Sequence, residues 1–268
     1  MVTRIIVGVI LAIAFAVVWY FGGVLFLAVC CAVSLLCAYE MLDVMKKAGR
    51  NICPIPIYIA AALVAPIVHY HNIYWYIAAL LLCIFASIVI RIFSDKSDND
   101  DMLCSLLIYI YPLTTLAILF NVCYISRLAM LLTFAGPLIG DTLAYFFGVT
   151  MGRRKLCENV SPKKTIAGSI GGIIGGGLGG LLTYFIQFSN LPINITPKIY
   201  GVVELIIIGL VLGITGQVGD LFASCIKRWA GVKDYGSIFP GHGGMMDRID
   251  SVMMSAPFVL VAFSLILG

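Results

Sequence analysis

Long apolar runs dominate this chain, and their length limits the folds that are open to it. Of its 268 residues, 62% are hydrophobic and only 11% are charged, whereas about 25% of a soluble domain is charged. A helix needs about 20 apolar residues to cross the hydrocarbon core of a bilayer. We therefore predict an all-α integral membrane protein with about nine transmembrane helices, near residues 4–20, 22–39, 54–70, 74–92, 103–121, 125–147, 166–187, 200–219 and 251–267.

The basic residues indicate how these helices are oriented, because short cytoplasmic loops are enriched in lysine and arginine. With the N-terminus in the cytoplasm, all of the 17 basic residues except Arg127 and Lys198 fall on the cytoplasmic side. We therefore predict a cytoplasmic N-terminus, an external C-terminus and two large cytoplasmic loops, at 148–165 and 220–250.

A glycine-rich run from Ala167 to Gly180 has two interpretations. A phosphate-binding loop needs a strand before it and a Lys-Ser/Thr pair after it, and the sequence has neither. Gly168, Gly172, Gly176 and Gly180 instead recur at every fourth residue. This spacing places them on one helix face and lets another helix approach closely. We expect helix packing here, and such a face also leaves a homodimer open.

Carboxylates at or within the apolar runs mark a candidate site. An ionisable group at membrane depth costs at least about 2.5–3.5 kcal/mol, so it indicates function by default. Asp141, Glu204 and Asp220 are placed in this way. Asp141 and Asp220 each follow a glycine near the cytoplasmic end of a run. Such a glycine permits a close backbone approach or a helix break, which would leave the carboxylate facing a cavity. No motif surrounds Glu204.

A polar stretch from Lys233 to Asp250 separates the last two apolar runs. Asp220 lies before it, and Asp247 and Asp250 lie at its end. Carboxylates from separate segments suit Mg²⁺, which takes one or two of them and shares phosphate oxygens, while lysine and arginine neutralise the remaining phosphate charge. The alternative is a basic loop that only orients the last helix and touches anionic lipids. Asp250 has an alternative as well, since aspartate commonly caps a helix N-terminus.

The same stretch resembles the signature of the phosphatidate cytidylyltransferase (CDP-diacylglycerol synthase) family. The matching residues are Ser224-x-Ile226-Lys227-Arg228, Lys233-Asp234-x-Gly236 and Phe239-Pro240-x-His242-Gly243-Gly244-Met245-x-Asp247-Arg248-Ile249-Asp250. The segments 140–148, 161–172 and 216–220 are similar to further family blocks, and Glu40 is a weaker echo. Many members carry glutamate where this chain has Ala223, so any role of that glutamate is absent here or supplied elsewhere.

The resemblance implies an enzyme that transfers the cytidylyl group of CTP to phosphatidic acid, which gives CDP-diacylglycerol and pyrophosphate. It implies N-terminal transmembrane helices at 1–122 and a catalytic transmembrane region at 123–268. We expect a multi-pass protein of a bacterial inner membrane, with its site on the cytoplasmic face, in contact with membrane lipids and without a nucleic-acid partner.

The resemblance and the residue chemistry together assign roles within the site. Asp220 and Asp247 are the predicted Mg²⁺ ligands and Asp250 is the next candidate, with a second cation left open. Asp141 holds that cation or orients the lysines, unless it serves only helix packing. The remaining predicted residues bind phosphates or the lipid headgroup: Lys227, Arg228, Lys233 and Arg248 as catalytic residues, and Lys163, Lys164, Ser224 and His242 as substrate-binding residues.

Two other classes of protein fit part of this pattern. A transporter would line a permeation path with buried acids, but the acids and bases here gather at one face. A CTP-dependent kinase of a polyprenol or phytol would transfer the terminal phosphate and release CDP, whereas cytidylyl transfer releases pyrophosphate.

Overall fold

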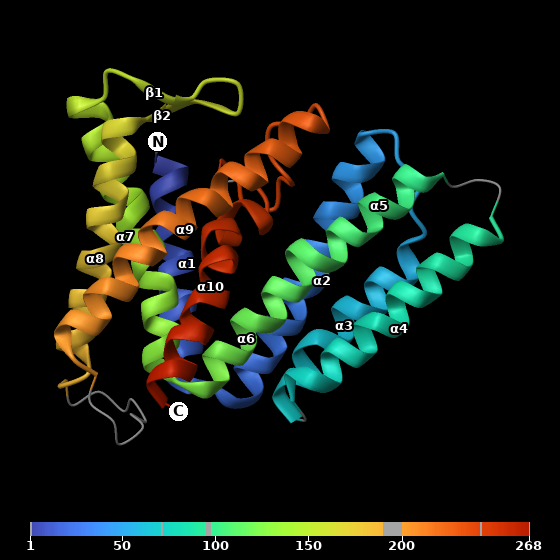
Figure 1. Ribbon diagram of the computed structural model, residues 1–268, viewed down its shortest axis with the longest axis horizontal. Helices are drawn as coiled ribbons and strands as arrows, with labels where there is room; N and C mark the ends of the chain where they lie inside the picture. Colours follow the sequence, from blue (N-terminus) through green and yellow to red (C-terminus); the bar gives the residue numbers. More distant parts are fainter. Residues whose placement is uncertain (1, 71, 95–97, 190–199, 242, 268) are drawn as a thin grey trace. The chain divides into compact units, whose positions relative to one another are not determined.

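A computed structural model describes residues 2–70, 72–94, 98–189, 200–241 and 243–267. Helices form nearly all of it, with one short strand pair (Figure 1). The elements are α1 (Val2–Phe21), α2 (Gly23–Lys47), α3 (Pro54–Tyr70), α4 (Ile73–Ile92), α5 (Asn99–Ile108), the π-helical turn η1 (Tyr109–Thr114), α6 (Thr115–Ile125), α7 (Arg127–Met151), β1 (Lys155–Cys157), β2 (Ser161–Thr165), α8 (Ile166–Ile186), α9 (Val202–Trp229) and α10 (Met246–Leu267).

The helices are those of a multi-pass membrane protein, which confirms the predicted all-α membrane fold. Within the described part of the chain, seven helices are long and apolar enough to cross a membrane, counting α5 to α6 as one helix of 27 residues. The apolar helix α3 is shorter, with 17 residues, and α1 coincides with the first predicted run. The number nine and the sides of the two termini stay predictions.

The chain forms two compact units that interleave along the sequence. The first contains Met1–Asn121 and Ile226–Ile249, and the second contains Val122–Cys225 and Asp250–Gly268. Helices α9 and α10 each contribute residues to both units. The division into N-terminal helices at 1–122 and a catalytic region at 123–268 stays a prediction.

Helices α9 and α10 are longer than their apolar runs. A span predicted from hydropathy ends where charged residues begin, but a helix can continue past them. The α9 helix stops just before Gly231, whose φ of 70° is the left-handed conformation that glycine tolerates. The N–H of Val232 donates to the carbonyl of Lys227 at 2.9 Å and closes this end. Asp220 and Lys227 therefore lie on one helix, and α10 begins at Met246 instead of residue 251.

In the second unit, α8 packs against α7 through a glycine face. A Cβ added at Gly175 would lie 2.7 Å from the carbonyl oxygen of Ile139, and one at Gly179 would lie 2.8 Å from the Cα of Gly136. The two helices run side by side in Figure 1. Only glycine lets the two backbones come this close.

A second glycine face of α8 packs against α9. A Cβ added at Gly176 would lie 2.6 Å from the backbone nitrogen of Gly213, and one at Gly172 would lie 2.5 Å from Nε2 of Gln217. The predicted packing role is confirmed, and the helix has two packing faces where the sequence indicated one. Gly168 of the predicted stripe belongs to the α7 side, 2.8 Å from the carbonyl oxygen of Ala144 by the same construction.

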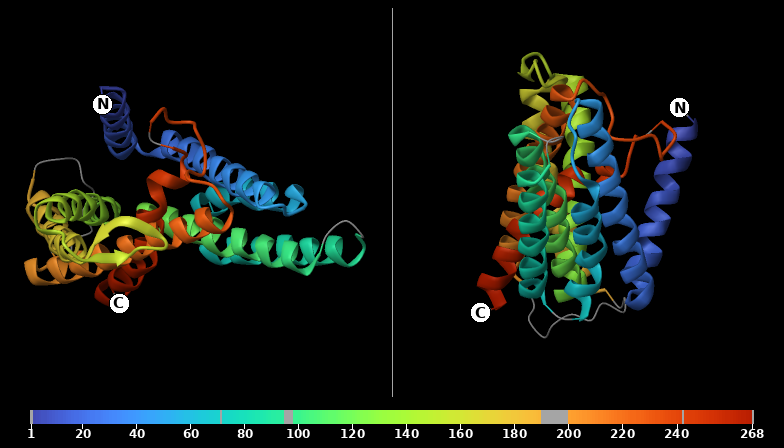
Figure 2. Two further views of the ribbon diagram at one scale, coloured as in Figure 1. Left: turned by 90° about the horizontal axis from the view of Figure 1, so that it is seen from above. Right: turned by 90° about the vertical axis from the view of Figure 1, so that its right-hand side faces the viewer.

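The predicted loop 148–165 contains the end of α7 and an antiparallel hairpin of β1 and β2. Figure 2 shows this hairpin at one end of the α7–α8 pair. Thr165 ends the hairpin and begins α8, because its Oγ1 accepts a hydrogen bond from the N–H of Gly168 at 3.1 Å. Lys155, Lys163 and Lys164 are thereby fixed at the end of the helices.

In the first unit, buried polar groups join the helices. Ser34 of α2 donates to the carbonyl of Ala61 of α3 at 2.8 Å. Asp98 and Asp101 form a capping box at the start of α5, and Asp101 also accepts from the N–H of Asn51 at 3.1 Å. These contacts join α2 to α3 and the loop between them to the start of α5.

The glycine faces of α8 give a direct test of the packing. Gly175→Ala forces a methyl group against backbone atoms, and we expect it to destabilise the protein by about 1–3 kcal/mol. Gly177→Ala is the matched control, because the same methyl group would meet side-chain atoms instead of backbone, those of Leu210 at 2.9 Å and Ile206 at 3.8 Å. Thermal unfolding in detergent measures both. Equal shifts in Tm for the two variants would contradict the packing role of the α7-facing glycines.

Candidate active site

A cavity of about 520 Å³ in the second unit gathers predicted site residues. It lies among α7, the hairpin, α8 and α9. Asp141, Lys163, Lys164 and Asp220 all line it, together with Lys155, which was not predicted as a site residue. Asp141 is exposed and lines this cavity; its role as a cation ligand, as a residue that orients the lysines or in helix packing stays a prediction.

Lys164 and Asp220 form an ion pair within this cavity. The Nζ of Lys164 lies 2.6 Å from Oδ2 of Asp220, and the two side chains are 24% and 32% exposed. The glycines before the two cavity aspartates are also packed: a Cβ at Gly219 would lie 2.6 Å from the carbonyl oxygen of Asp250, and one at Gly140 would lie 3.0 Å from that of Gly172. The prediction of a close backbone approach at these glycines is confirmed.

Gln217 fixes the wall of the cavity between α8 and α9. Its Nε2 donates to the carbonyl of Ser169 on α8 at 3.1 Å and to that of Gly213 on α9 at 2.7 Å. Gln217 lies one helical turn before Asp220, within α9. The carboxylate of Asp220 therefore projects from a helix segment that is tied to its neighbour.

Asp250 lies on α10 in the second unit and is 5% exposed. Its Oδ1 accepts from the N–H of Ser251 at 2.7 Å and from the Ser251 hydroxyl at 3.3 Å. The alternative that Asp250 caps α10 is wrong, because the helix already begins at Met246. Ser224 is also buried, on α9.

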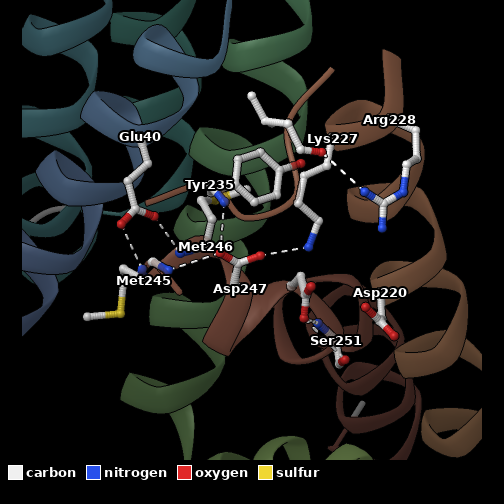
Figure 3. A network of polar contacts seen from close by, with 12 residues as sticks. Glu40, Asp220, Lys227, Arg228, Tyr235, Met245, Met246, Asp247 and Ser251 are labelled. Atoms are coloured by element: carbon white, nitrogen blue, oxygen red, sulfur yellow. Dashed lines mark hydrogen bonds and ion pairs between the residues drawn. The ribbon is translucent and has the colours of Figure 1, made fainter. Parts of the chain in front are cut away.

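Asp247 lies in the first unit, at the centre of a buried polar network (Figure 3). Its Oδ1 accepts from the Nζ of Lys227 at 2.6 Å, and its Oδ2 accepts from the N–H groups of Tyr235 at 2.8 Å and Gly244 at 2.9 Å. The side chains of Lys227 and Asp247 are only 10% and 4% exposed. The Lys227 ammonium also lies 5.3 Å from the centre of the Tyr235 ring, within range of a cation–π interaction.

Glu40 of α2 supports the same turn from the other side, as Figure 3 shows. Its Oε1 accepts from the N–H of Met245 and its Oε2 from that of Met246, both at 2.8 Å. Glu40 is 1% exposed. A carboxylate at a helix N-terminus is favoured by the helix dipole and by the unpaired N–H groups there, so Glu40 stabilises the start of α10.

The glycines of the Pro-Gly-His-Gly-Gly segment allow these carboxylates to come close. Gly243 has a φ of 83°, and a Cβ there would lie 2.7 Å from Oδ2 of Asp247. A Cβ at Gly236 would lie 2.6 Å from Oε1 of Glu40, and Gly244 is in equally close contact with that carboxylate. The N–H of Phe239 donates to the carbonyl of Gly243 at 3.0 Å and closes the turn.

The same bonds exclude one mode of phosphate binding. A glycine-rich turn before a helix commonly cradles phosphate with its N–H groups. Here the N–H groups of Gly244, Met245 and Met246 donate to Asp247 and Glu40. The protein's own carboxylates occupy these three N–H groups, so the three are not available to a phosphate.

The other predicted residues of the first unit are at its surface. Arg228, Lys233 and Arg248 are exposed, and Arg228 donates to the carbonyl of Val232 at 3.3 Å. His242 lies outside the described residues. Because Asp220 and Asp247 belong to different units, the prediction that they share one cation stays a prediction.

The carboxylates fit Mg²⁺ by their donor chemistry. No group of three or more His, Cys, Asp or Glu side chains that could hold a metal ion occurs in the described ranges. An ionised carboxylate has about four lone-pair positions, of which Asp247 uses three. One or two such ligands are enough for Mg²⁺, since it keeps several waters and binds substrate phosphates.

Comparison with known proteins identifies the family. The Cytidylyltransferase family matches residues 2–266. The chain belongs to this family.

The relatives of this cytidylyltransferase-family chain include proteins named phosphatidate cytidylyltransferase and one named as uncharacterized. It is 43% identical over 125 residues to the phosphatidate cytidylyltransferase of Bacillus subtilis (strain 168), a match that covers 47% of this chain and 43% of that protein. For the phosphatidate cytidylyltransferase of Staphylococcus haemolyticus (strain JCSC1435), identity is 43% over 119 residues, covering 44% and 42%. For the uncharacterized protein YnbB of Escherichia coli (strain K12), it is 40% over 117 residues, covering 44% and 36%. The chain thus spans less than half the length of each.

Two acids of this cytidylyltransferase-family chain were not explained by sequence. In the sequence, Glu40 was only a weak echo of the family. Its structural role could not be predicted, because its partners are backbone groups more than 200 residues away. Glu204, which no motif surrounds, lies in the first turn of α9, where its Oε2 accepts from the N–H of Gly201 at 3.2 Å. Its position three residues after Gly201, the residue that precedes the helix, is the one available signal for this role.

The turn before α10 can be tested with two glycines. Gly231→Ala adds a methyl group in open space at a φ of 70°, which costs about 1–2 kcal/mol for the backbone conformation alone. Gly243→Ala adds the same strain and also a clash with Asp247, so we expect a larger loss of stability. Unfolding of both variants in detergent measures the difference. Equal losses of stability in the two variants would show that the close approach of Gly243 to Asp247 does not contribute to stability.

Proposed function

We propose that this chain transfers the cytidylyl group of CTP to phosphatidic acid and releases pyrophosphate. The observation that carries the proposal is the pairing of acids with bases in a chain of the cytidylyltransferase family. Asp220 forms an ion pair with Lys164, and Asp247 forms one with Lys227, each at 2.6 Å. Such groups suit two anionic substrates and a divalent cation. The names of the relatives from Bacillus and Staphylococcus support the choice of reaction.

In the proposed reaction, a phosphate oxygen of phosphatidic acid attacks the α-phosphorus of CTP. A new P–O–P bond forms, the bond from the α-phosphorus to the bridging oxygen of the β-phosphate breaks, and pyrophosphate leaves with that electron pair. The nucleophile is already an anion, so no strong general base is needed. The difficulty is to bring two mutually repelling anions together, which positioning and charge neutralisation achieve.

The basic residues neutralise and orient these phosphates in the proposed mechanism. Lys163 and Lys164 contribute from the cavity of the second unit, and Lys227 from the first unit. The exposed residues Arg228, Lys233 and Arg248 of the first unit add positive charge that attracts CTP. Asp220, Asp247 and Asp250 are the candidate ligands for Mg²⁺, which would supply positive charge against the phosphates when bound.

The cavity of the second unit suits the lipid substrate. Beside its lysines, it is lined by Tyr145 and Val149 of α7, and these side chains are 67% and 69% exposed on a helix that can cross a membrane. A lipid can therefore place its phosphate against the lysines while its acyl chains remain beside an apolar helix. We place this site on the cytoplasmic face of a bacterial inner membrane, where CTP is found; a homodimer stays a prediction.

The reaction is tested with purified protein in detergent, phosphatidic acid, Mg²⁺ and CTP labelled on the cytidine. We expect a lipid product that retains the cytidine label and one pyrophosphate released per lipid formed. Entry of the terminal phosphate into lipid, with cytidine left wholly in water, would instead indicate a lipid kinase. The absence of any turnover, with solute flux in liposomes, would indicate a transporter.

The role of Asp220 is tested by Asp220→Asn, which keeps the size of the side chain but removes its charge. We expect turnover to fall by about 100-fold or more, the range seen when one charge-stabilising group is lost. Asp43→Asn is the control, because Asp43 forms an ion pair with Lys47, four residues along α2, and is not a predicted site residue. A near-normal rate for Asp220→Asn across a titration of Mg²⁺ would remove Asp220 from the site.

A further inference from the structure

Glu40 holds the start of α10 from a helix that lies outside the family signature. Both of its carboxylate oxygens accept N–H groups of this start, from Met245 and Met246, each at 2.8 Å. The side chain is 1% exposed, and two glycines, Gly236 and Gly244, are in close contact with it. A buried carboxylate that uses both oxygens in this way fixes the position of the backbone it binds.

Asp247 directly follows the two residues that Glu40 holds. Its carboxylate turns back over the same turn and accepts the N–H groups of Gly244 and Tyr235. The three consecutive N–H groups of residues 244–246 are thus shared between two carboxylates, one from α2 and one from α10. A shift of this turn would move Asp247 and its bond to Lys227 together.

We infer that Glu40 is a positioning residue for Asp247: it orients the reactive end of α10 without contacting either substrate. This inference rests on the proposed function for its kinetic consequence, but its structural consequence can be measured independently. A merely structural role for Glu40 would lower stability and leave the orientation of Asp247 unchanged in the folded protein.

The test compares Glu40→Gln with Ser34→Ala. The glutamine amide presents an NH₂ group to one of the two N–H donors, so one hydrogen bond is replaced by a repulsive contact. Ser34 is the matched control: it lies on the same helix, is fully buried and donates to the carbonyl of Ala61 at 2.8 Å, a bond within the α2–α3 pair. Both variants lose a buried hydrogen bond of α2, and only one of them touches the start of α10.

Two measurements separate a positioning role from a structural one. For Glu40→Gln we expect kcat to fall by about 10- to 100-fold, the usual effect of losing a group that orients a site residue, with the KM for phosphatidic acid unchanged. We also expect the N–H groups of Tyr235 and Gly244 to exchange with deuterium about tenfold faster, because they donate to Asp247 and report its position. Ser34→Ala should lower Tm but keep kcat and this exchange near the wild-type values.

The possible results decide the inference. Slowed turnover with unchanged exchange at Tyr235 and Gly244, or equal losses in both variants, would overturn it. If the wild-type protein makes no cytidylylated lipid, the proposed function fails, and exchange at Tyr235 and Gly244 alone decides whether Glu40 positions Asp247. If Glu40→Gln does not fold, Glu40→Asp is used, since it keeps the charge but is too short to reach both N–H groups.

Discussion

The arrangement depends on one constraint: a charged group at the end of a membrane helix needs partners within the protein, because unpaired burial is costly. Glu40 and Asp247 meet this need with the N–H groups at the start of α10, and those N–H groups would otherwise lack acceptors themselves. The carboxylates and the N–H groups therefore satisfy one another's hydrogen bonds. The polar turn of the first unit is built around these bonds, and glycine is needed at positions 236, 243 and 244 because the two carboxylates leave little space there.

In the second unit, close helix packing supports the candidate site residue Asp220. Helix α8 has little side-chain bulk on two of its faces, so α7 and α9 approach it to within backbone contact. This close packing and the bonds from Gln217 to α8 and α9 give Asp220 a rigid support. The hairpin that follows α7 then brings Lys163 and Lys164 to the cavity. A rigid support matters here, because positioning carries most of the catalysis in the proposed reaction.

Much of this could be predicted from the sequence, and the remainder depends on contacts that a single sequence does not show. The length of the apolar runs gave the helices, and the spacing of the signature residues gave the family. Hydropathy ended α9 too early, because a helix continues past the membrane until a residue such as Gly231 stops it. The second glycine face of α8 and the role of Glu40 both depend on which helices become neighbours, and local patterns do not encode that.

The bond between α2 and α10 has a consequence for how the protein is made. Glu40 leaves the ribosome 205 residues before Met245. Its carboxylate therefore lacks its two N–H donors until Met245 and Met246 have been synthesised. The turn that carries Asp247 can be completed only after residues 244–246 have been synthesised, long after α2. Assembly of this end of the protein is thus a late step, in which α10 binds a residue of a helix made much earlier.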